Sequence, residues 1–325
     1  MNRLIGFTTL TNVGSLGYPF LESIYSHLNV VDEMVIAEDA TDALTKNALI
    51  RISKNKRIKI FKLSWDFSTK NVAAGRVVGD AFERTLKWVK NNYDNKSFVF
   101  DFQSNEIIHE NSYGDINIYV RDAEYPQDSG LKAFLVPYNL LCGNYVNTFA
   151  DERIRIAKLS AKLSIRGDGT QFSVGSDSIK SDIIDVGKAL SSSIINKDFY
   201  NKIGLPFVYN IMPLPIRPIF RYGVIFKNAY MKKLQNHMEA WSKKAEMYKK
   251  AFEFASKLKN CDNQDDFYKS VAEYKMPARK MSLGHPLSKP QRVESKYHPK
   301  IIRDILMQKD YRIRESVIKQ ILELR

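Results

Sequence analysis

The chain has 325 residues, and its 44% hydrophobic and 26% charged content is typical of globular proteins and excludes fibrous or largely disordered ones. The 50 Lys and Arg against 36 Asp and Glu leave a formal charge of +14, which favours anionic partners such as nucleotides, nucleic acids or acidic membrane surfaces. The two cysteines, Cys142 and Cys261, lack CxxC spacing, so neither a disulfide framework nor a zinc site is indicated, and a reducing cytoplasm is expected. No apolar stretch approaches the roughly 20 residues of a membrane-spanning helix, so any membrane contact is expected to be peripheral.

Strand and helix patterns alternate over residues 4–102. Short apolar runs predict buried strands at 4–10, 34–36, 58–63 and 97–102. Apolar residues at helical spacing predict one helix that begins near Phe20 and another over 72–89. The acidic segment that follows the second strand is expected to lead through a loop into the third. This alternation predicts an α/β fold with a mixed, mostly parallel sheet and flanking helices, whose ligands gather at the carboxyl ends of the strands.

The middle of the chain contains a candidate functional loop and a candidate domain boundary. Residues 117–168 mix short strands with the loop Arg166-Gly167-Asp168-Gly169, and Gly and Asp are typical of such loops. Four prolines exclude a regular helix from 206–218. We therefore expect a catalytic α/β domain over 1–218 and a basic, mainly helical C-terminal extension over 219–325.

One long helix is expected in this extension, because apolar residues follow alternating four- and three-residue steps. These residues are Leu234, Met238, Trp241, Ala245, Tyr248, Phe252 and Ala255. The apolar seam predicts packing against the catalytic domain, or against a second copy of the chain in a homodimer. Lysines cover the other faces, and we interpret them as a solvated face in preference to a docking surface for anionic lipid. A polar loop then precedes a closing helix over 301–324.

Three polar segments follow elements of the predicted sheet and form the candidate site. They are Glu38-Asp39, Gln103-Ser104-Asn105-Glu106 and Asp168. Each also has a simpler structural explanation. Taken alone, Glu38 to Thr41 is better explained as a helix cap, because Asp and Thr are favoured at that position. Asp168 between two glycines suits an ordinary turn.

The central segment is the most informative, because the apolar strand 97–102 runs directly into side chains that carry oxygens. Hard divalent cations prefer oxygen ligands, and a metal that bridges the phosphates of a sugar nucleotide neutralises the charge on the departing diphosphate. From the pattern alone, a metal site and a polar turn at a strand end explain this segment equally well.

The order of several short motifs resembles a subgroup of the family-two glycosyltransferases. Gln103-Ser104-Asn105-Glu106 resembles its "LQADE" segment, a local form of the DxD metal motif. Glu38-Asp39-Ala40-Thr41-Asp42 is similar to its acidic nucleotide-binding loop, and Gly167-Asp168-Gly169-Thr170-Gln171 is similar to its "GDAQ" segment. Arg221-Tyr222-Gly223-Val224 and Gly284-His285-Pro286 resemble its "HYGWV" and "GSHP" elements. These landmarks cover most of the chain in the order that the family has.

The resemblance implies a GT-A (Rossmann-like) fold and a glycosyltransferase. Such an enzyme moves a sugar from a nucleotide-diphosphate donor to a hydroxyl of a glycan, a lipid-linked glycan or a protein, here with inversion. The donor-binding residues that the resemblance implies are Thr8, Thr9, Thr11, Glu38, Asp39 and Gln103. The implied metal ligands are Asn105 and Glu106, for Mn²⁺ or Mg²⁺. Asp168 is then the general base that takes the proton of the acceptor hydroxyl.

Two positions depart from the family pattern. Asn105 stands where the family has an acid, and Arg221 stands where it has the histidine of "HYG". Either Glu106 or Asp101 compensates for the weaker amide ligand, or nearby Lys and Arg neutralise the diphosphate in place of a metal. Two other classes of function remain open. One is a catalytically inactive binding module of the same fold. The other is a basic nucleic-acid-binding protein, which no helix-turn-helix or RNA-binding signature supports.

Overall fold

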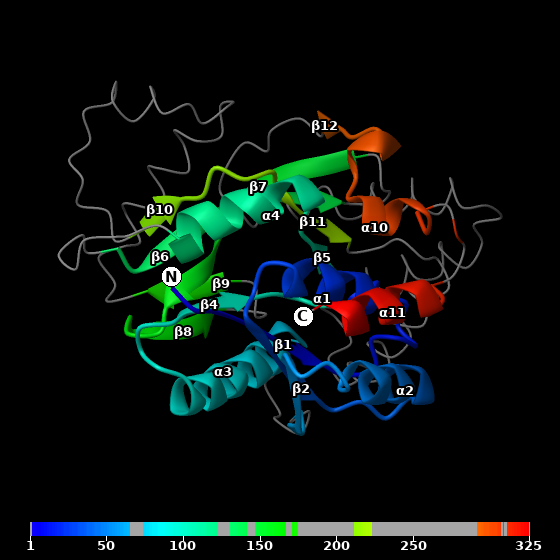
Figure 1. The fold of residues 1–325 in the computed structure, drawn as a ribbon, viewed down its shortest axis with the longest axis horizontal. Helices are drawn as coiled ribbons and strands as arrows, with labels where there is room; N and C mark the ends of the chain where they lie inside the picture. Colours follow the sequence, from blue (N-terminus) through cyan, green and yellow to red (C-terminus); the bar gives the residue numbers. More distant parts are fainter. Residues whose placement is uncertain are drawn as a thin grey trace, which may run out of the picture.

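The computed structural model describes residues 2–65, 74–122, 131–141, 147–166, 171–174, 211–222, 291–306, 308 and 311–324 (Figure 1). The N-terminal part alternates β1 (Leu4–Leu10), α1 (Phe20–Leu28), β2 (Glu33–Glu38), α2 (Ala43–Ile52), β3 (Ile58–Lys62), α3 (Ala74–Asn92) and β4 (Phe98–Asp101). The strands that follow are β5 (Glu106–Ile107), β6 (Ala133–Leu141), β7 (Asn147–Lys158), β8 (Leu163–Arg166), β9 (Gln171–Val174), β10 (Ile211–Pro213), β11 (Ile219–Tyr222) and β12 (Gln291–Arg292). The helices described beyond β4 include α4 (Tyr113–Ile116), α10 (Lys300–Arg303) and α11 (Glu315–Glu323).

A ten-stranded mixed sheet forms the centre of the molecule. Its strand order is β3-β2-β1-β4-β7-β6-β11-β5, with β10 paired to β6 and β12 paired to β7. The first four of these strands run parallel, whereas β7 is antiparallel to both β4 and β6. The chain moves outward from β1 to β2 and β3, and then returns to β4 on the other side of β1. In open α/β sheets, such a reversal of strand order marks the crevice in which ligands bind.

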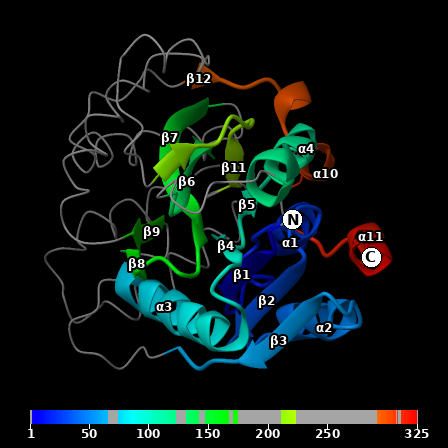
Figure 2. The same cartoon turned by 60° about the vertical axis from the view of Figure 1, so that its left-hand side comes forward.

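Helices cover both faces of this sheet (Figure 2). On one face, α1, α2, α10 and α11 enclose a core that includes Phe20, Ile36 and Ile321. On the other face, α3 and the hairpin of β8 and β9 enclose a second core, which includes Phe7 and Phe82. Full burial of a side chain of this kind contributes roughly 1.5–3 kcal/mol. The parallel strands are therefore held between two apolar layers, and their carboxyl ends are left at the edge.

The prediction of a loop between the second and third strands is wrong, because α2 fills most of this connection. Asp42 caps the helix, and its Oδ1 accepts a hydrogen bond from the Thr45 backbone nitrogen at 2.9 Å. Ala48, Leu49 and Ile52 are buried on the inner side of α2. The helix cap suggested by the acidic segment is therefore present, but the residue that supplies it is Asp42.

Two further elements differ from the sequence prediction. β6 and β7 contain nine and twelve residues, whereas the sequence predicts short strands in this region. The closing helix predicted over 301–324 is divided, within the described residues, into α10 and α11. Arg314 stands in an extended conformation directly before α11, where its guanidinium donates to Glu22 and to the Ile301 carbonyl. The Arg314 side chain thus ties the segment before α11 to α1 and α10.

The described segments beyond residue 218 join the same sheet and the same core. β11 pairs with β5 and β6, β12 pairs with β7, and α10 and α11 contact α1. The division into two domains at residue 218 stays a prediction, because residues 223–290, including the long helix expected there, lie outside the described residues. No helix among those described is long and apolar enough to cross a bilayer.

Candidate functional site

The carboxyl ends of β1, β2 and β4 meet where the strand order reverses. In the sheet register, Phe7 of β1 lies beside Asp101 of β4, and Leu10 of β1 lies beside Glu38 of β2. The residues that follow these pairs therefore share one edge of the sheet. They include the threonines of 8–11, the pair Glu38-Asp39 and Gln103, so the fold brings the predicted donor-binding residues together.

Trp65 connects the end of β1 with the segment that follows β2. Its indole Nε1 donates to Thr9 Oγ1 at 3.2 Å, and its backbone nitrogen donates to Asp39 Oδ2 at 2.8 Å. Thr11 Oγ1 donates to the Asp39 carbonyl at 3.3 Å. An aromatic ring, two hydroxyls and a carboxylate thus gather at this corner. Such groups can pack against a planar base and hydrogen-bond to the hydroxyls of a ribose.

Asn12 ties the loop after β1 to the start of α2. Its Oδ1 accepts hydrogen bonds from the backbone nitrogens of Thr41 at 2.7 Å and of Asp42 at 3.0 Å. Gly14 approaches α2 closely, since its nitrogen donates to Thr45 Oγ1 at 2.9 Å. A Cβ at Gly14 would meet the Thr45 backbone nitrogen at 3.2 Å, which explains the glycine. Two loops at the site edge are therefore joined to each other.

Three of the predicted donor-binding residues, Thr8, Thr9 and Glu38, are buried. Thr8 is fully buried, and its Oγ1 has no hydrogen-bond partner among the residues that the structure describes. Glu38 Oε2 accepts from the Ala40 nitrogen at 2.9 Å, and Lys62 Nζ lies 3.7 Å from Oε1. The roles of these residues in donor binding stay predictions, and the partly exposed members of the set at the corner beside Trp65 are Thr11 and Asp39.

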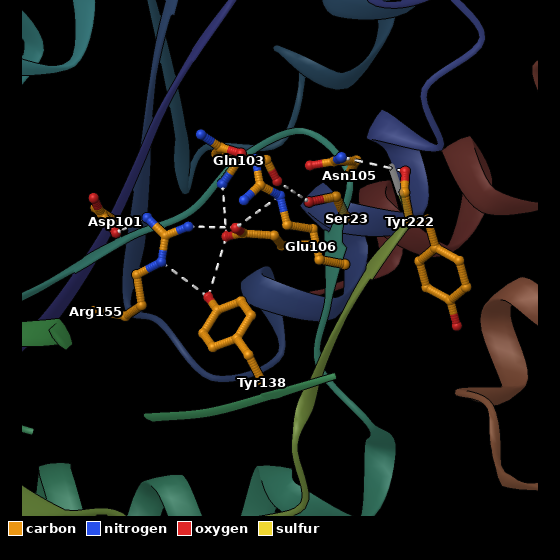
Figure 3. Close-up of polar contacts among 9 residues, drawn as sticks. Ser23, Asp101, Gln103, Asn105, Glu106, Tyr138, Arg155 and Tyr222 are labelled. Atoms are coloured by element: carbon orange, nitrogen blue, oxygen red, sulfur yellow. Dashed lines mark hydrogen bonds and ion pairs between the residues drawn. The ribbon is translucent and has the colours of Figure 1, made fainter. Parts of the chain in front are cut away.

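A buried charge network lies at the end of β4 (Figure 3). The guanidinium of Arg155, from β7, donates to both Asp101 and Glu106, and all three side chains are fully buried. Tyr138 OH accepts from Arg155 Nε at 3.0 Å and donates to Glu106 Oε2 at 3.2 Å. Arg221 Nε, from β11, lies 3.9 Å from Glu106 Oε1. Two acids therefore share one buried guanidinium.

Burial controls the protonation of this network. It raises the pKa of Asp101 to about 7, because the loss of water outweighs the attraction of Arg155, and the charge of Glu106 opposes ionisation further. Burial by itself lowers the pKa of Arg155, but the charges of Asp101 and Glu106 hold it well above its ordinary value. Arg155 therefore stays charged, whereas Asp101 takes up a proton near neutral pH.

Gln103 and Asn105 are held by hydrogen bonds to neighbouring elements. The Gln103 nitrogen donates to Glu106 Oε2 at 2.9 Å, and its carbonyl accepts from Ser23 Oγ at 3.1 Å. Asn105 Nδ2 donates to the Tyr222 carbonyl at 3.2 Å, and the Tyr222 nitrogen donates back to the Asn105 carbonyl at 2.8 Å. The turn between β4 and β5 is thus fixed against both α1 and β11 (Figure 3).

The predicted metal site does not fit a divalent cation in this arrangement. Glu106 is fully buried and both of its oxygens already accept hydrogen bonds, and Asn105 Nδ2 donates to the Tyr222 carbonyl. Within the part of the chain that the structure describes, no three His, Cys, Asp or Glu side chains form a group able to hold a metal ion. The metal roles of Asn105 and Glu106 stay predictions.

Sequence analysis missed Trp65, Tyr138 and Arg155. One signal for Arg155 is present in β7, where Arg153 and Arg155 alternate with Ile154 and Ile156, so that two charges repeat on one face of the strand. Nothing in the pattern around Trp65 distinguishes it from a core aromatic residue. The predicted base, Asp168, lies outside the described residues.

Comparison with known protein families and with curated proteins finds no match. Two crystal structures of S. aureus TarS align with 86% and 87% of this chain at 11% and 12% identity, with TM-scores of 0.38 and 0.33. This chain spans only 44% of the first TarS chain and 73% of the second. A structure of a putative glucose-1-phosphate thymidylyltransferase from Bacillus anthracis, in complex with a sucrose, aligns with 65% of this chain and 85% of its own at 9% identity and a TM-score of 0.30. These similarities are too low to carry a functional argument, and the geometry itself shows a mixed α/β fold with Rossmann-like strand order.

Proposed function

We propose that the chain is a glycosyltransferase with a GT-A-type fold. It transfers a sugar from a nucleotide-diphosphate donor to a hydroxyl of a glycan, a lipid-linked glycan or a protein, with inversion at the anomeric carbon. The observation that supports this most is the reversal of strand order beside β1, where Thr9, Thr11 and Asp39 meet at the carboxyl edge. In α/β sheets this is the position that binds nucleotides.

The diphosphate of the donor is proposed to lie toward the end of β4. Negative charge grows on this group as the bond between its oxygen and the anomeric carbon breaks, and a fixed cation stabilises that charge. Arg221 is a suitable cation, because it is partly exposed on β11, next to Glu106. The acceptor hydroxyl forms the new bond to the anomeric carbon and gives its proton to a carboxylate, for which Asp168 is the proposed group.

The proposal is tested with a panel of UDP-, GDP-, ADP-, CDP- and dTDP-sugars. A donor-dependent enzyme should be stabilised against heat by one nucleotide class and should hydrolyse that donor slowly without an acceptor. Stabilisation without hydrolysis would identify the inactive binding module instead. Stabilisation by oligonucleotides alone would identify a nucleic-acid-binding protein.

A pair of variants ties the result to the proposed site. Asp39→Asn keeps an acceptor for the Trp65 nitrogen but removes the charge, so donor binding should weaken by about tenfold. Asp80→Asn removes a carboxylate that is 56% exposed on α3 and should leave binding unchanged. If Asp39→Asn binds the donor as tightly as Asp80→Asn does, this edge of the sheet is not the nucleotide site.

A further inference from the structure

We propose that this protein binds its nucleoside diphosphate without a divalent cation, because the guanidinium of Arg155 already pairs with both acids at the end of β4, Asp101 and Glu106. This inference rests on the proposed function and specifies how its donor is held. It concerns the same site, but it removes the metal that the motif pattern implied there.

Both carboxylate oxygens of Glu106 already accept hydrogen bonds. Glu106 Oε1 accepts from Arg155, and Oε2 accepts from Tyr138 OH at 3.2 Å and from the Gln103 nitrogen at 2.9 Å. Glu106 is fully buried, so it reaches no ligand in solvent without a rearrangement. Three hydrogen-bond donors therefore already use this carboxylate, which leaves little acceptor capacity for a cation.

The balance of charge near the end of β4 also disfavours a divalent cation. Three guanidiniums face two carboxylates, because Arg153 and Arg221 add to Arg155 against Asp101 and Glu106. Arg153 lies 5.8 Å from the centre of the Tyr138 ring, and its charge acts on Asp101. Among the described residues, the guanidiniums near this network therefore outnumber its carboxylates in either protonation state of Asp101. An excess of positive charge attracts a diphosphate and repels a divalent cation.

Replacement of Arg155 by a metal ion would also destabilise the protein. If a divalent cation replaced Arg155 on the two acids, a guanidinium that is fully buried would lose its partners. Removing the partner of a buried charge is strongly destabilising. A protein that used a metal here would have to offset this loss each time the metal bound, whereas the present pairing needs no exchange.

Arg221 is the group that we assign to the diphosphate. Arg155 is completely enclosed and acts only by positioning and neutralising the acids, whereas the Arg221 side chain is 16% exposed. In the sheet register Arg221 lies opposite Glu106, at the start of β5, and the preceding turn carries Gln103. Arg155 therefore pairs with the two buried acids, and Arg221 is the cationic side chain beside them that we assign to the diphosphate.

The test measures binding of UDP, GDP, ADP, CDP and dTDP to the full chain by calorimetry, in EDTA and again in Mn²⁺. The expected result is that one nucleotide binds in EDTA, with an affinity within about threefold of that in Mn²⁺, a difference of ~0.7 kcal/mol. A larger gain in Mn²⁺, or binding in Mn²⁺ alone, overturns this inference and leaves the proposed function intact. No binding under either condition overturns the proposed function as well.

Two arginine variants test the assignment of the contact group. Arg221→Gln should weaken nucleotide binding in EDTA by about tenfold or more, the effect of one charge-assisted hydrogen bond. Arg217→Gln is the control, because Arg217 lies on the same segment before β11 with an exposed side chain, and it should bind as the wild type does. If both variants bind like the wild type, Arg221 is not the diphosphate contact.

Discussion

Glu22, His27 and Asp101 are ionisable residues that the fold buries completely, and burial shifts the pKa of each toward its uncharged form. Burial lowers the pKa of His27 to about 3, although its bond to the Ser23 carbonyl opposes the shift. Burial raises the pKa of Glu22 and that of Asp101, the latter to about 7. His27 also stacks on Phe102, with ring centroids 3.9 Å apart. These residues make the stability of the protein depend on pH.

Asp101→Asn should change that dependence in a defined direction. Since the carboxyl has a pKa near 3.8 when unfolded and about 7 when folded, the folded state binds more protons between these values. The wild type should therefore lose stability as pH rises from about 4 to 7, by on the order of 2 kcal/mol between pH 5 and pH 8 from this group alone. The variant keeps an acceptor for Arg155 and loses this contribution. Urea unfolding of both proteins at several pH values measures the difference in their unfolding free energies. The contributions of His27 and Glu22 are the same in both proteins and cancel in this difference. If the unfolding free energy of both proteins changes equally with pH, Asp101 is not buried in its protonated form.

Asn105→Asp distinguishes a metal ligand from a structural amide. The amide donates to the Tyr222 carbonyl, and Asn105 is only 6% exposed, so a carboxylate there would face a carbonyl oxygen. We expect a loss of about 1–3 kcal/mol in unfolding free energy and no gain in Mn²⁺ affinity with nucleotide present. If Asn105 belongs to a metal site, the opposite follows, because a carboxylate is the better ligand for a hard cation. Asn111→Asp, at an exposed position nearby, serves as the control.

Asp168→Asn tests the proposed general base. The amide keeps the size of the side chain and cannot take a proton, so sugar transfer should fall by about a hundredfold or more while donor binding survives. Transfer rates to an acceptor and donor affinity by calorimetry give the two readouts. If transfer continues at the wild-type rate, Asp168 is not the base, and Asp151 or Glu152 becomes the next candidate.

Helix α11 shows how elements far apart in the chain complete the fold. Asn55, which follows α2, donates from Nδ2 to the carbonyls of Ile321 at 2.6 Å and Leu324 at 2.9 Å. The segment before α11 is held by Glu22, whose Oε2 accepts from Tyr311 OH at 3.0 Å and whose Oε1 accepts from Arg314. The carbonyls at the end of a helix lack partners within it, so a buried side-chain donor there stabilises the helix end.

Asn55→Ala should therefore loosen α11. The two carbonyls lose their shared donor inside a buried contact, which should lower the unfolding free energy by about 1–3 kcal/mol. Hydrogen exchange should increase in α11 more than in α3, which packs on the opposite face. Asn47→Ala, at an exposed position of α2, is the control. It should leave hydrogen exchange in α11 unchanged and the unfolding free energy unchanged or slightly higher, since alanine favours helix. If hydrogen exchange increases equally in α11 and α3, the hydrogen bonds of Asn55 do not stabilise α11 specifically.

The first four strands and two of their helices were predictable, because each carries a local pattern. β1 spans the predicted residues, and α1 begins at the predicted Phe20. α2 was harder to predict because its apolar residues are not confined to one face: Leu44 and Ile50 are exposed, whereas Ala48, Leu49 and Ile52 are buried. The pairing of β7 with β4 joins residues 56 to 60 positions apart, and the bonds from Arg155 to Asp101 and Glu106 span 54 and 49 positions. No periodicity encodes such contacts, so the candidate edge was predictable but its charge balance was not.

The whole molecule carries a formal charge of +14, and its oligomeric state and membrane contact stay predictions. The apolar seam expected at 234–255 needs a partner, either the catalytic domain or a second copy. We expect a monomer by light scattering at high concentration if the seam packs within the chain, and a dimer that dissociates on dilution if it does not. Flotation with anionic liposomes, and with neutral ones as control, tests the lysine-rich faces for lipid binding.

The contacts between Glu22 and Arg314 also have a consequence for biosynthesis. The two residues are separated by 292 positions, so a ribosome that adds about 5–20 residues per second needs roughly 15–60 s to deliver the second after the first. During this interval the outer side of α1 lacks the helix that will cover it, although β1 to β4 can already pair. The nascent chain should therefore expose an apolar stripe for tens of seconds, and a chaperone that recognises such stripes should bind it until residues 311–324 emerge.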